Sequence, residues 1–173
     1  QDEKTGEVRP AQYGDIAMLF RRMSDVHLYE RALQDAGVPY TLVAGAGFYS
    51  RQEILDVLNL LKVILDGWDE VALFGFLRSP MVSLSDAALY RLTRSAPLPA
   101  AFAGDATLED PDEAHRLDAA RALIATLRSE ATRPVESILR HALELTGYEA
   151  ILLSTHHGPR KVANVRKLVQ LAE

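Results

Sequence analysis

The spacing of apolar and polar positions predicts an α/β unit in the first part of the chain. Residues 15–20 are apolar almost throughout, as expected of a strand buried on both faces. Apolar residues then recur at helical spacing over 26–36, and residues 40–43 are rich in strand-forming types. A helix that is apolar on nearly every side follows over 54–65. This order predicts a partial α/β fold, strand–helix–strand–helix.

From residue 69 onward the pattern is helical, and no segment has the composition of a good strand. Helical faces are predicted at 71–77, 87–92, 117–127, 135–143 and 162–172. Prolines and acidic residues over 95–112 predict a loop, and the polar residues 1–12 predict a tail or linker. The chain therefore divides into an α/β part over 13–68 and an all-α part over 69–173.

Composition narrows the class of protein. The chain has 173 residues, of which 48% are hydrophobic, so it can bury a sizeable core. The net charge of −5 argues against a compact nucleic-acid binder that works alone. The absence of cysteine excludes disulfides and thiolate metal sites, and it fits a reducing, cytoplasmic location. No apolar run is long enough for a membrane-spanning helix, so we expect no membrane partner.

The two ends suggest an excerpt from a longer protein. The chain does not begin with methionine, and Glu173 lies inside a run with helical periodicity. We therefore expect further domains of a parent protein to be among its partners.

Motifs for a self-contained active site are not found. The Gly45-Ala46-Gly47 turn comes between a predicted strand and a predicted helix, which is the setting of a phosphate-binding loop. However, Ser50 replaces the last glycine of G-x-G-x-x-G, and G-x-x-x-x-G-K-S/T does not occur. The histidines lack metal-ligand spacing, and G-x-S-x-G is missing. We predict no catalytic residue, no metal site and no bound cofactor in these 173 residues.

Two basic features are candidates for binding phosphate. Arg21 and Arg22 follow the first predicted strand, and open α/β sheets bind ligands at the carboxyl ends of their strands. The segment 156–167 contains no acid, and its cationic residues are Arg160, Lys161, Arg166 and Lys167. Such a segment contacts DNA phosphates or is simply the solvated start of a helix, and the sequence leaves both interpretations open.

The start of the helix over 54–65 has its own signal. Ser50 and Glu53 have the spacing of a capping box, in which each side chain accepts a hydrogen bond from the other residue's backbone. We therefore predict that Glu53 caps this helix.

Several of these segments resemble the UvrD/Rep family of superfamily 1 DNA helicases, nearest to its RecB/AddA-like branch (exonuclease V beta-like). The most specific block is Phe48 with the Arg51-Gln52-Glu53-Ile54 and Asp56 that follow. Near the end, Gly147-Tyr148 and the Arg160 to Leu168 segment, with Asn164, resemble the family's helical R-x-x-N-L-x-x-L segment.

The resemblance implies a fold and a function. Residues 13–68 would be part of the RecA-like subdomain 2A, and residues 69–173 most of the helical insertion 2B. The family translocates 3′ to 5′ along single-stranded DNA, driven by ATP hydrolysis. Its phosphate loop and Mg²⁺-binding acids would precede this excerpt, so ATP and Mg²⁺ would be cofactors of the parent protein only. DNA, at the junction of single strand and duplex, would be the main partner.

Site residues follow from the resemblance one by one. Arg21 corresponds to the family's Y-R-S/T-N element near the single strand, and Gly45 to the second glycine of a G-G pair. Phe48 and Glu53 correspond to structural positions, one packing and one capping. Ser83 and Ser85 stand where UvrD-like members have a G-I-G turn that contacts duplex DNA. Non-glycine residues resist positive φ, which makes a close approach harder, although serine hydroxyls can still donate to phosphate.

Two functions other than the DNA-contacting helicase region remain open. The helical part can be a protein-interaction module that docks a nuclease subunit or other domains, and the acidic net charge favours this. A third class, a small enzyme that stands alone, would require a gene that encodes these residues only.

Overall fold

A computed structural model describes residues 9–22, 24–40, 48–94 and 96–172. It divides the chain into two compact units, residues 1–49 and 50–173. Helix 52–65 belongs to the second unit, whereas the sequence pattern placed the change near residue 68. The assignment of the parts to subdomains 2A and 2B stays a prediction.

The prediction of an α/β fold is wrong, because the described residues are all-α and contain no strand. Ile16 has extended backbone angles of φ −105° and ψ 125°, yet residues 16–20 form no strand ladder with any described residue. A strand exists only through hydrogen bonds to a neighbour, and an apolar run does not supply that neighbour. Leu19 is accordingly 94% exposed. Of the second predicted strand, Tyr40 is not a strand residue, and 41–43 lie outside the described residues.

The first unit contains a short 3₁₀ turn, η1 (Tyr13–Asp15), and helix α1 (Val26–Asp35). Arg9 holds η1 through a two-pronged ion pair with Asp15, with both N–O distances at 2.6 Å. The hydroxyl of Tyr40 donates to Glu30 of α1 at 3.1 Å, so the chain after α1 folds back along it. The predicted helix over 26–36 is confirmed by α1.

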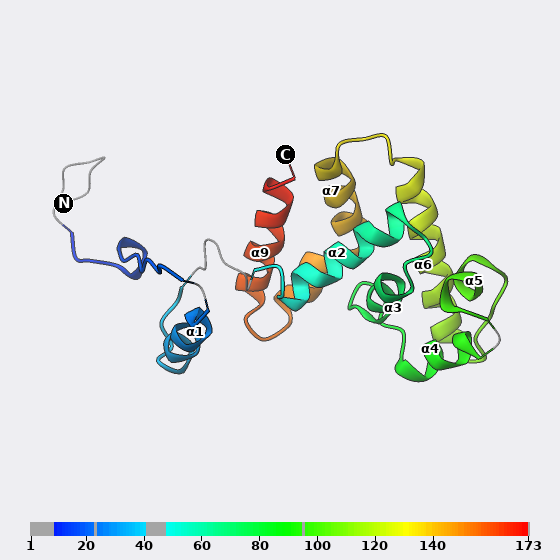
Figure 1. Cartoon of the computed structure of the whole chain (residues 1–173), viewed down its shortest axis with the longest axis horizontal. Coiled ribbons are helices and arrows are strands. Elements are labelled where there is room, and N and C mark those ends of the chain that lie inside the picture. The colour runs from blue at the N-terminus through cyan, green and yellow to red at the C-terminus, as the bar shows by residue number, and fades with distance from the viewer. Residues whose placement is uncertain (1–8, 23, 41–47, 95, 173) are drawn as a thin grey trace. The chain divides into compact units, whose positions relative to one another are not determined.

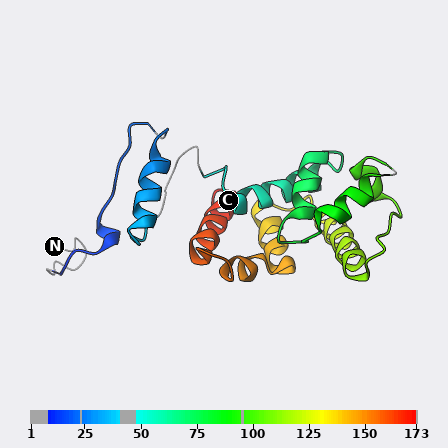
Figure 2. The same cartoon turned by 90° about the horizontal axis from the view of Figure 1, so that it is seen from below.

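The second unit is a bundle of eight helices in its described part. They are α2 (Gln52–Leu65), α3 (Glu70–Arg78), α4 (Asp86–Thr93), α5 (Leu98–Ala103), α6 (Pro111–Ser129), α7 (Val135–Thr146), α8 (Tyr148–Leu153) and α9 (Gly158–Gln170). Figure 1 shows α2 crossing the middle of this unit, with α9 on one side and α3 and α6 on the other. In Figure 2, α9 lies at one end of the unit, α4 and α5 lie at the other, and α7 lies between them.

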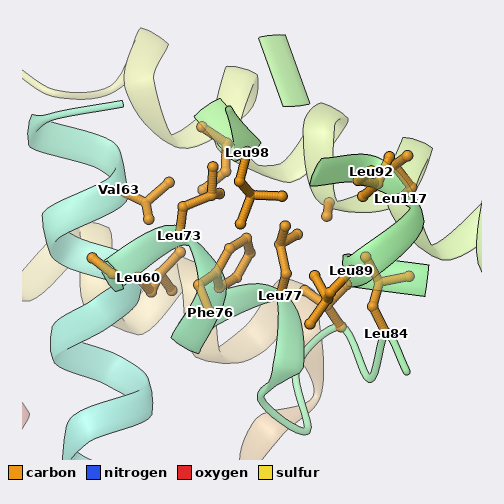
Figure 3. Close-up of a cluster of buried hydrophobic side chains, with 14 of the residues drawn as sticks. Leu60, Val63, Leu73, Phe76, Leu77, Leu84, Leu89, Leu92, Leu98 and Leu117 are labelled. Carbon is orange, nitrogen blue, oxygen red and sulfur yellow. The ribbon is translucent and has the colours of Figure 1, made fainter. Parts of the chain in front are cut away.

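An apolar core fills the space between α2, α3, α4, α5 and α6. Leu73, Phe76 and Leu77 of α3 lie at its centre, each 0% exposed. Leucines of α2, α4 and α6 face them in Figure 3. Most positions of the helical faces predicted from spacing are buried, as expected of amphipathic helices, although Val71 and Val135 at the starts of two of them are exposed.

The predicted loop over 95–112 is also wrong in part. Helix α5 lies inside it, and α6 begins at Pro111. Proline is well tolerated in the first turn of a helix, where its missing N–H has no partner to lose. Pro99 and Pro111 both occupy such positions, so they start helices here.

Two arginines of α6 donate hydrogen bonds to backbone carbonyl oxygens at the ends of other helices. Arg121 donates to the carbonyl oxygens of Ala101, Phe102 and Ala106, at 3.0, 2.9 and 2.8 Å. Arg128 donates to Val63 at 2.8 Å and to Ile64 at 3.3 Å, at the end of α2. The last carbonyls of a helix lack partners within it, and these guanidinium groups supply them.

Candidate functional site

The basic segment predicted over 156–167 forms the turn before α9 and most of that helix. His157 precedes the helix with a left-handed φ of 58°, and its ring centroid lies 3.7 Å from that of His156. A Cβ on Gly158 would lie 2.5 Å from the carbonyl oxygen of Leu153. Only glycine permits this close approach of the two backbones. The tight turn therefore fixes where α9 begins.

The basic groups at this turn lie close enough to affect one another. The pKa of His157 is lowered, first by partial desolvation of its ring and then by the charges of His156, Arg160 and Lys161. The ammonium of Lys161 also donates to Thr155 Oγ1 at 2.9 Å. We call these four residues, His156, His157, Arg160 and Lys161, the cationic start of α9.

Arg166 and Lys167 are farther along the helix and differ from this group. The guanidinium of Arg166 donates to the Glu149 carboxylate of α8 at 2.6 and 3.1 Å. This pairing lowers the pKa of Glu149 and raises that of Arg166. Arg166 therefore faces an acid of its own chain, and Lys167 is half-buried. The structure groups only two of the four predicted cations, Arg160 and Lys161, with the histidines.

A buried set of polar side chains holds α9 and α8 against α2. Asn164 of α9 donates to Glu53 Oε1 at 2.7 Å, and the Tyr148 hydroxyl donates to Asp56 Oδ2 at 2.7 Å. All four side chains are buried, with Tyr148 at 0% and Asp56 at 1% exposed. We call Glu53, Asp56, Tyr148 and Asn164 the polar seam. It joins the two sequence blocks that carry the family resemblance, which are 92 and 111 residues apart at these contacts.

The electrostatics of the polar seam follow from its burial. Loss of water raises the pKa of Asp56, while hydrogen bonds from Tyr148 and Gln52 act to lower it and the nearby Glu53 raises it further. Burial also raises the pKa of Tyr148, and its bond to Asp56 adds to the effect. The Gln52 amide donates to the other Asp56 oxygen at 2.7 Å. Each Asp56 oxygen therefore has a donor, which a buried carboxylate requires.

Helix α2 begins one residue later than the predicted capping box requires. The N-cap residue is Arg51 in place of Ser50, the Arg51 side chain does not accept a capping hydrogen bond, and Glu53 bonds to Asn164. The spacing of Ser50 and Glu53 fits a capping box, but the Glu53 carboxylate accepts a hydrogen bond from the buried Asn164 amide of α9. Phe48 is 4% exposed and meets the Tyr49 ring edge-on at 5.2 Å, in agreement with its expected packing role.

The serine pair at the start of α4 forms a turn with an acid beside it. Ser83 has a φ of 61°, a conformation that favours glycine, and its carbonyl accepts from Arg116 at 3.0 Å. Ser85 caps α4 by accepting from the backbone of Ala88. The Ser85 amide itself donates to the Glu113 carboxylate at 3.3 Å. A phosphate at this turn would compete with Glu113 for the amide, so contact by Ser83 and Ser85 stays a prediction.

The remaining candidates belong to the first unit. Arg21 and Arg22 are exposed in the segment before α1. Gly45 lies outside the described residues. The structure therefore gives no geometry that relates these three to the cationic start of α9.

Comparisons with known proteins decide the family. The UvrD-like helicase C-terminal domain matches residues 5–113. The chain belongs to the UvrD-like helicase family. It is similar to an ATP-dependent helicase/nuclease protein of the AddA type from Desulfitobacterium hafniense, at 30% identity over 83% of the chain and 11% of that relative. The protein of the same name in Ruminiclostridium cellulolyticum is 27% identical over 99% of the chain and 14% of the relative.

The family membership confirms the resemblance seen in the sequence, including the AddA-like branch. The chain spans 11% to 14% of the length of these two curated relatives. In the part of the chain that the structure describes, no three His, Cys, Asp or Glu side chains gather as a metal site would require. No helix there is long and apolar enough to cross a membrane.

The pairing of the family's motif residues was not predicted. Glu53 and Asp56 belong to one block of the sequence and Tyr148 and Asn164 to another, and the sequence did not indicate that the blocks meet. The available signal was polar residues on faces that helical periodicity buries. Asp56 lies between Ile54, Val57 and Leu60 in a helix apolar nearly all round, so it needed a buried donor.

Proposed function

We propose that this chain is a DNA-contacting and regulatory region of an ATP-dependent 3′-to-5′ helicase that acts in DNA repair and recombination. The observation that supports this most is the cationic start of α9, where Arg160 and Lys161 gather with two histidines in a segment without acids. A motor that moves along DNA needs a surface that binds phosphates without reading sequence.

The polar seam gives the cationic start of α9 a fixed place. Asn164 is three and four residues beyond Lys161 and Arg160, about one helical turn, and its bond to Glu53 fixes the rotation of α9. The side chains of Arg160 and Lys161 are half-buried, so their positions are held by packing as well. A preordered pair of cations loses less conformational entropy on binding phosphate than two free surface side chains would.

ATP hydrolysis is assigned to other parts of the parent protein. The sequence has no phosphate loop. We propose that this region is inactive alone and acts on DNA held by the complete motor. Its further partners would be the other domains of the parent and a nuclease subunit.

The test is fluorescence anisotropy with a 3′-tailed DNA duplex, titrated from low to physiological salt. We expect binding that weakens as salt rises, because each phosphate contact releases counterions. Reversal of both charges, Arg160→Glu with Lys161→Glu, should reduce the slope of log affinity against log salt by about 2. The control reverses two exposed cations of another region, Arg91→Glu with Arg94→Glu, and should retain the slope.

Two results would contradict the proposal. One is a double variant at 160 and 161 that binds DNA as the original chain does. The other is an absence of binding by the original chain even at low salt. Circular dichroism of both double variants checks that the helices are retained.

A second function is protein docking by the helical unit. The net charge of −5 and the pairing of Arg166 with Glu149 favour it, because both reduce the positive surface available to DNA. Unchanged DNA affinity in the variant at Arg160 and Lys161 would support this function instead.

A further inference from the structure

The two histidines before α9 lie beside cations of the same segment. The ring centroids of His156 and His157 are 3.7 Å apart, so the two rings are in contact, and both residues are exposed. The ammonium of Lys161 donates to Thr155, the residue directly before the pair, and is thereby held at this turn. A ligand that approaches the turn from solvent therefore meets two imidazole rings together with an ammonium group.

Helix α9 adds to the positive potential at this turn. Its first turn contains no acid, and the side chain of its N-cap residue, His157, does not accept a capping hydrogen bond. The N-terminus of a helix carries a partial positive charge, which opposes a proton on an imidazole placed there. A proton on one ring also repels a proton on the other, because the two rings are in contact. In the chain alone, the surroundings therefore favour neutral imidazoles.

The helices around α9 do not offset this potential at His157. Helices α2, α7 and α8 pack against α9. Their titratable side chains are Glu53, Asp56, Lys62, Glu136, Arg140, His141, Glu144, Tyr148 and Glu149. Among the described residues, the charges that lower the pKa of His157 are those of His156, Arg160 and Lys161, after partial desolvation of the ring. The acid that precedes the histidines most closely in the sequence, Glu149, is bound by Arg166.

We propose that His156 and His157 are phosphate ligands, and that DNA binding at the cationic start of α9 takes up protons onto them. This inference rests on the proposed function, because it concerns the same contact with DNA. A phosphate beside the rings reverses the local potential and accepts a charge-assisted hydrogen bond from a protonated imidazole. Histidine changes its charge near neutral pH, so the contact becomes stronger as the solution becomes more acidic.

The test follows binding of the 3′-tailed duplex to the complete 173-residue chain by fluorescence anisotropy, at constant ionic strength, from pH 8 to pH 6. We expect the affinity to rise about fivefold over this range, since histidine ordinarily takes up its proton there. Charge reversal at Arg160 and Lys161 is measured at pH 8, where the histidines are neutral. That measurement tests the proposed function separately from the histidines.

Variants assign the proton uptake to these two residues. His156→Gln with His157→Asn replaces both rings by neutral amides, and asparagine tolerates the left-handed φ of 58° at position 157. The affinity of this double variant should stay nearly constant from pH 8 to pH 6. The matched control is His115→Gln, an exposed histidine of α6, which should keep the full pH dependence. Circular dichroism checks that both variants retain their helices.

A second measurement does not depend on affinity. The ring carbon-bound protons of each histidine report its protonation in an NMR titration. We expect the DNA duplex to move the titration midpoints of His156 and His157 to higher pH and to leave that of His115 in place. Histidines with a structural role only would titrate at the same pH with and without DNA.

Three results would overturn the proposal: an affinity that does not change with pH, an equal pH dependence in the double histidine variant, or unchanged midpoints in the NMR titration. If any of these occurs while charge reversal at Arg160 and Lys161 still weakens binding at pH 8, the proposed function stands and the histidines are not ligands. An absence of binding at both pH values would overturn both proposals.

Discussion

Helix α2 has two kinds of contact on its two sides. Toward α3 and α6 it buries leucine, isoleucine and valine in the apolar core, and toward α8 and α9 it makes the hydrogen bonds of the polar seam. Apolar packing tolerates different arrangements of similar volume, whereas a buried carboxylate needs its donor within a few tenths of an ångström. The difference suggests that the apolar core supplies most of the stability, and that the polar seam fixes the register of α9.

The largest expected effect is in the apolar core. Phe76→Ala removes a ring that is 0% exposed and leaves a cavity among leucines. We expect the free energy of unfolding to fall by about 3–5 kcal/mol. Urea unfolding followed by circular dichroism measures it, and Phe74→Ala on the exposed face of α3 is the control. Equal losses in the two variants would contradict the placement of the core.

A smaller loss of unfolding free energy is expected for a substitution in the polar seam. Asn164→Ala removes the donor of the buried Glu53 carboxylate, which should cost about 1.5–3 kcal/mol. The control is Gln170→Ala, an exposed amide of the same helix. Replacing both partners, Glu53→Leu with Asn164→Leu, should recover most of the loss, since a buried polar pair is often no better than an apolar one. If the polar seam fixes the rotation of α9, the variant with leucine at both positions should still bind DNA more weakly than the original chain does.

The smallest effect concerns pH. The pKa of Asp56 is raised in the folded state, so the folded chain keeps a proton that the unfolded chain releases. The stability from Asp56 is therefore complete below its ordinary pKa and declines as pH rises through the folded value. Asp56→Asn removes this decline, and the difference in unfolding free energy should move in favour of the variant from about pH 4 upward. A difference that is constant with pH would contradict the raised pKa.

Most of the helices were predictable because their signals are local, whereas the short helices α5 and α8 were not predicted. The end of α7 at Gly147, with a left-handed φ of 60°, and the cap of α4 by Ser85 follow from the residue types alone. The strand over 15–20 was not predictable in the same way. Continuous apolarity indicates burial on both faces, but pairing depends on residues elsewhere, and no described residue pairs with this segment.

The candidate site was predicted as a set of charges but not as a geometry. Sequence spacing placed Arg160 and Lys161 in a stretch without acids, and the structure groups them. The partner of Arg166 is Glu149, 17 residues earlier and on another helix, so no local pattern contains it. The pairing of Glu53 with Asn164 is more distant still, and only the fold brings these residues together.

The contacts of α2 also bear on synthesis of the protein. Its partner in α9 follows it by 111 residues, and ribosomes add roughly 5–20 residues per second. Glu53 is thus synthesised roughly 6–22 s before Asn164, its partner in the helix that covers this side of α2. During that interval Glu53 and Asp56 are still hydrated, and carboxylates on a largely apolar helix oppose aggregation of the nascent chain. The residues that later become buried can therefore protect the chain while it is incomplete.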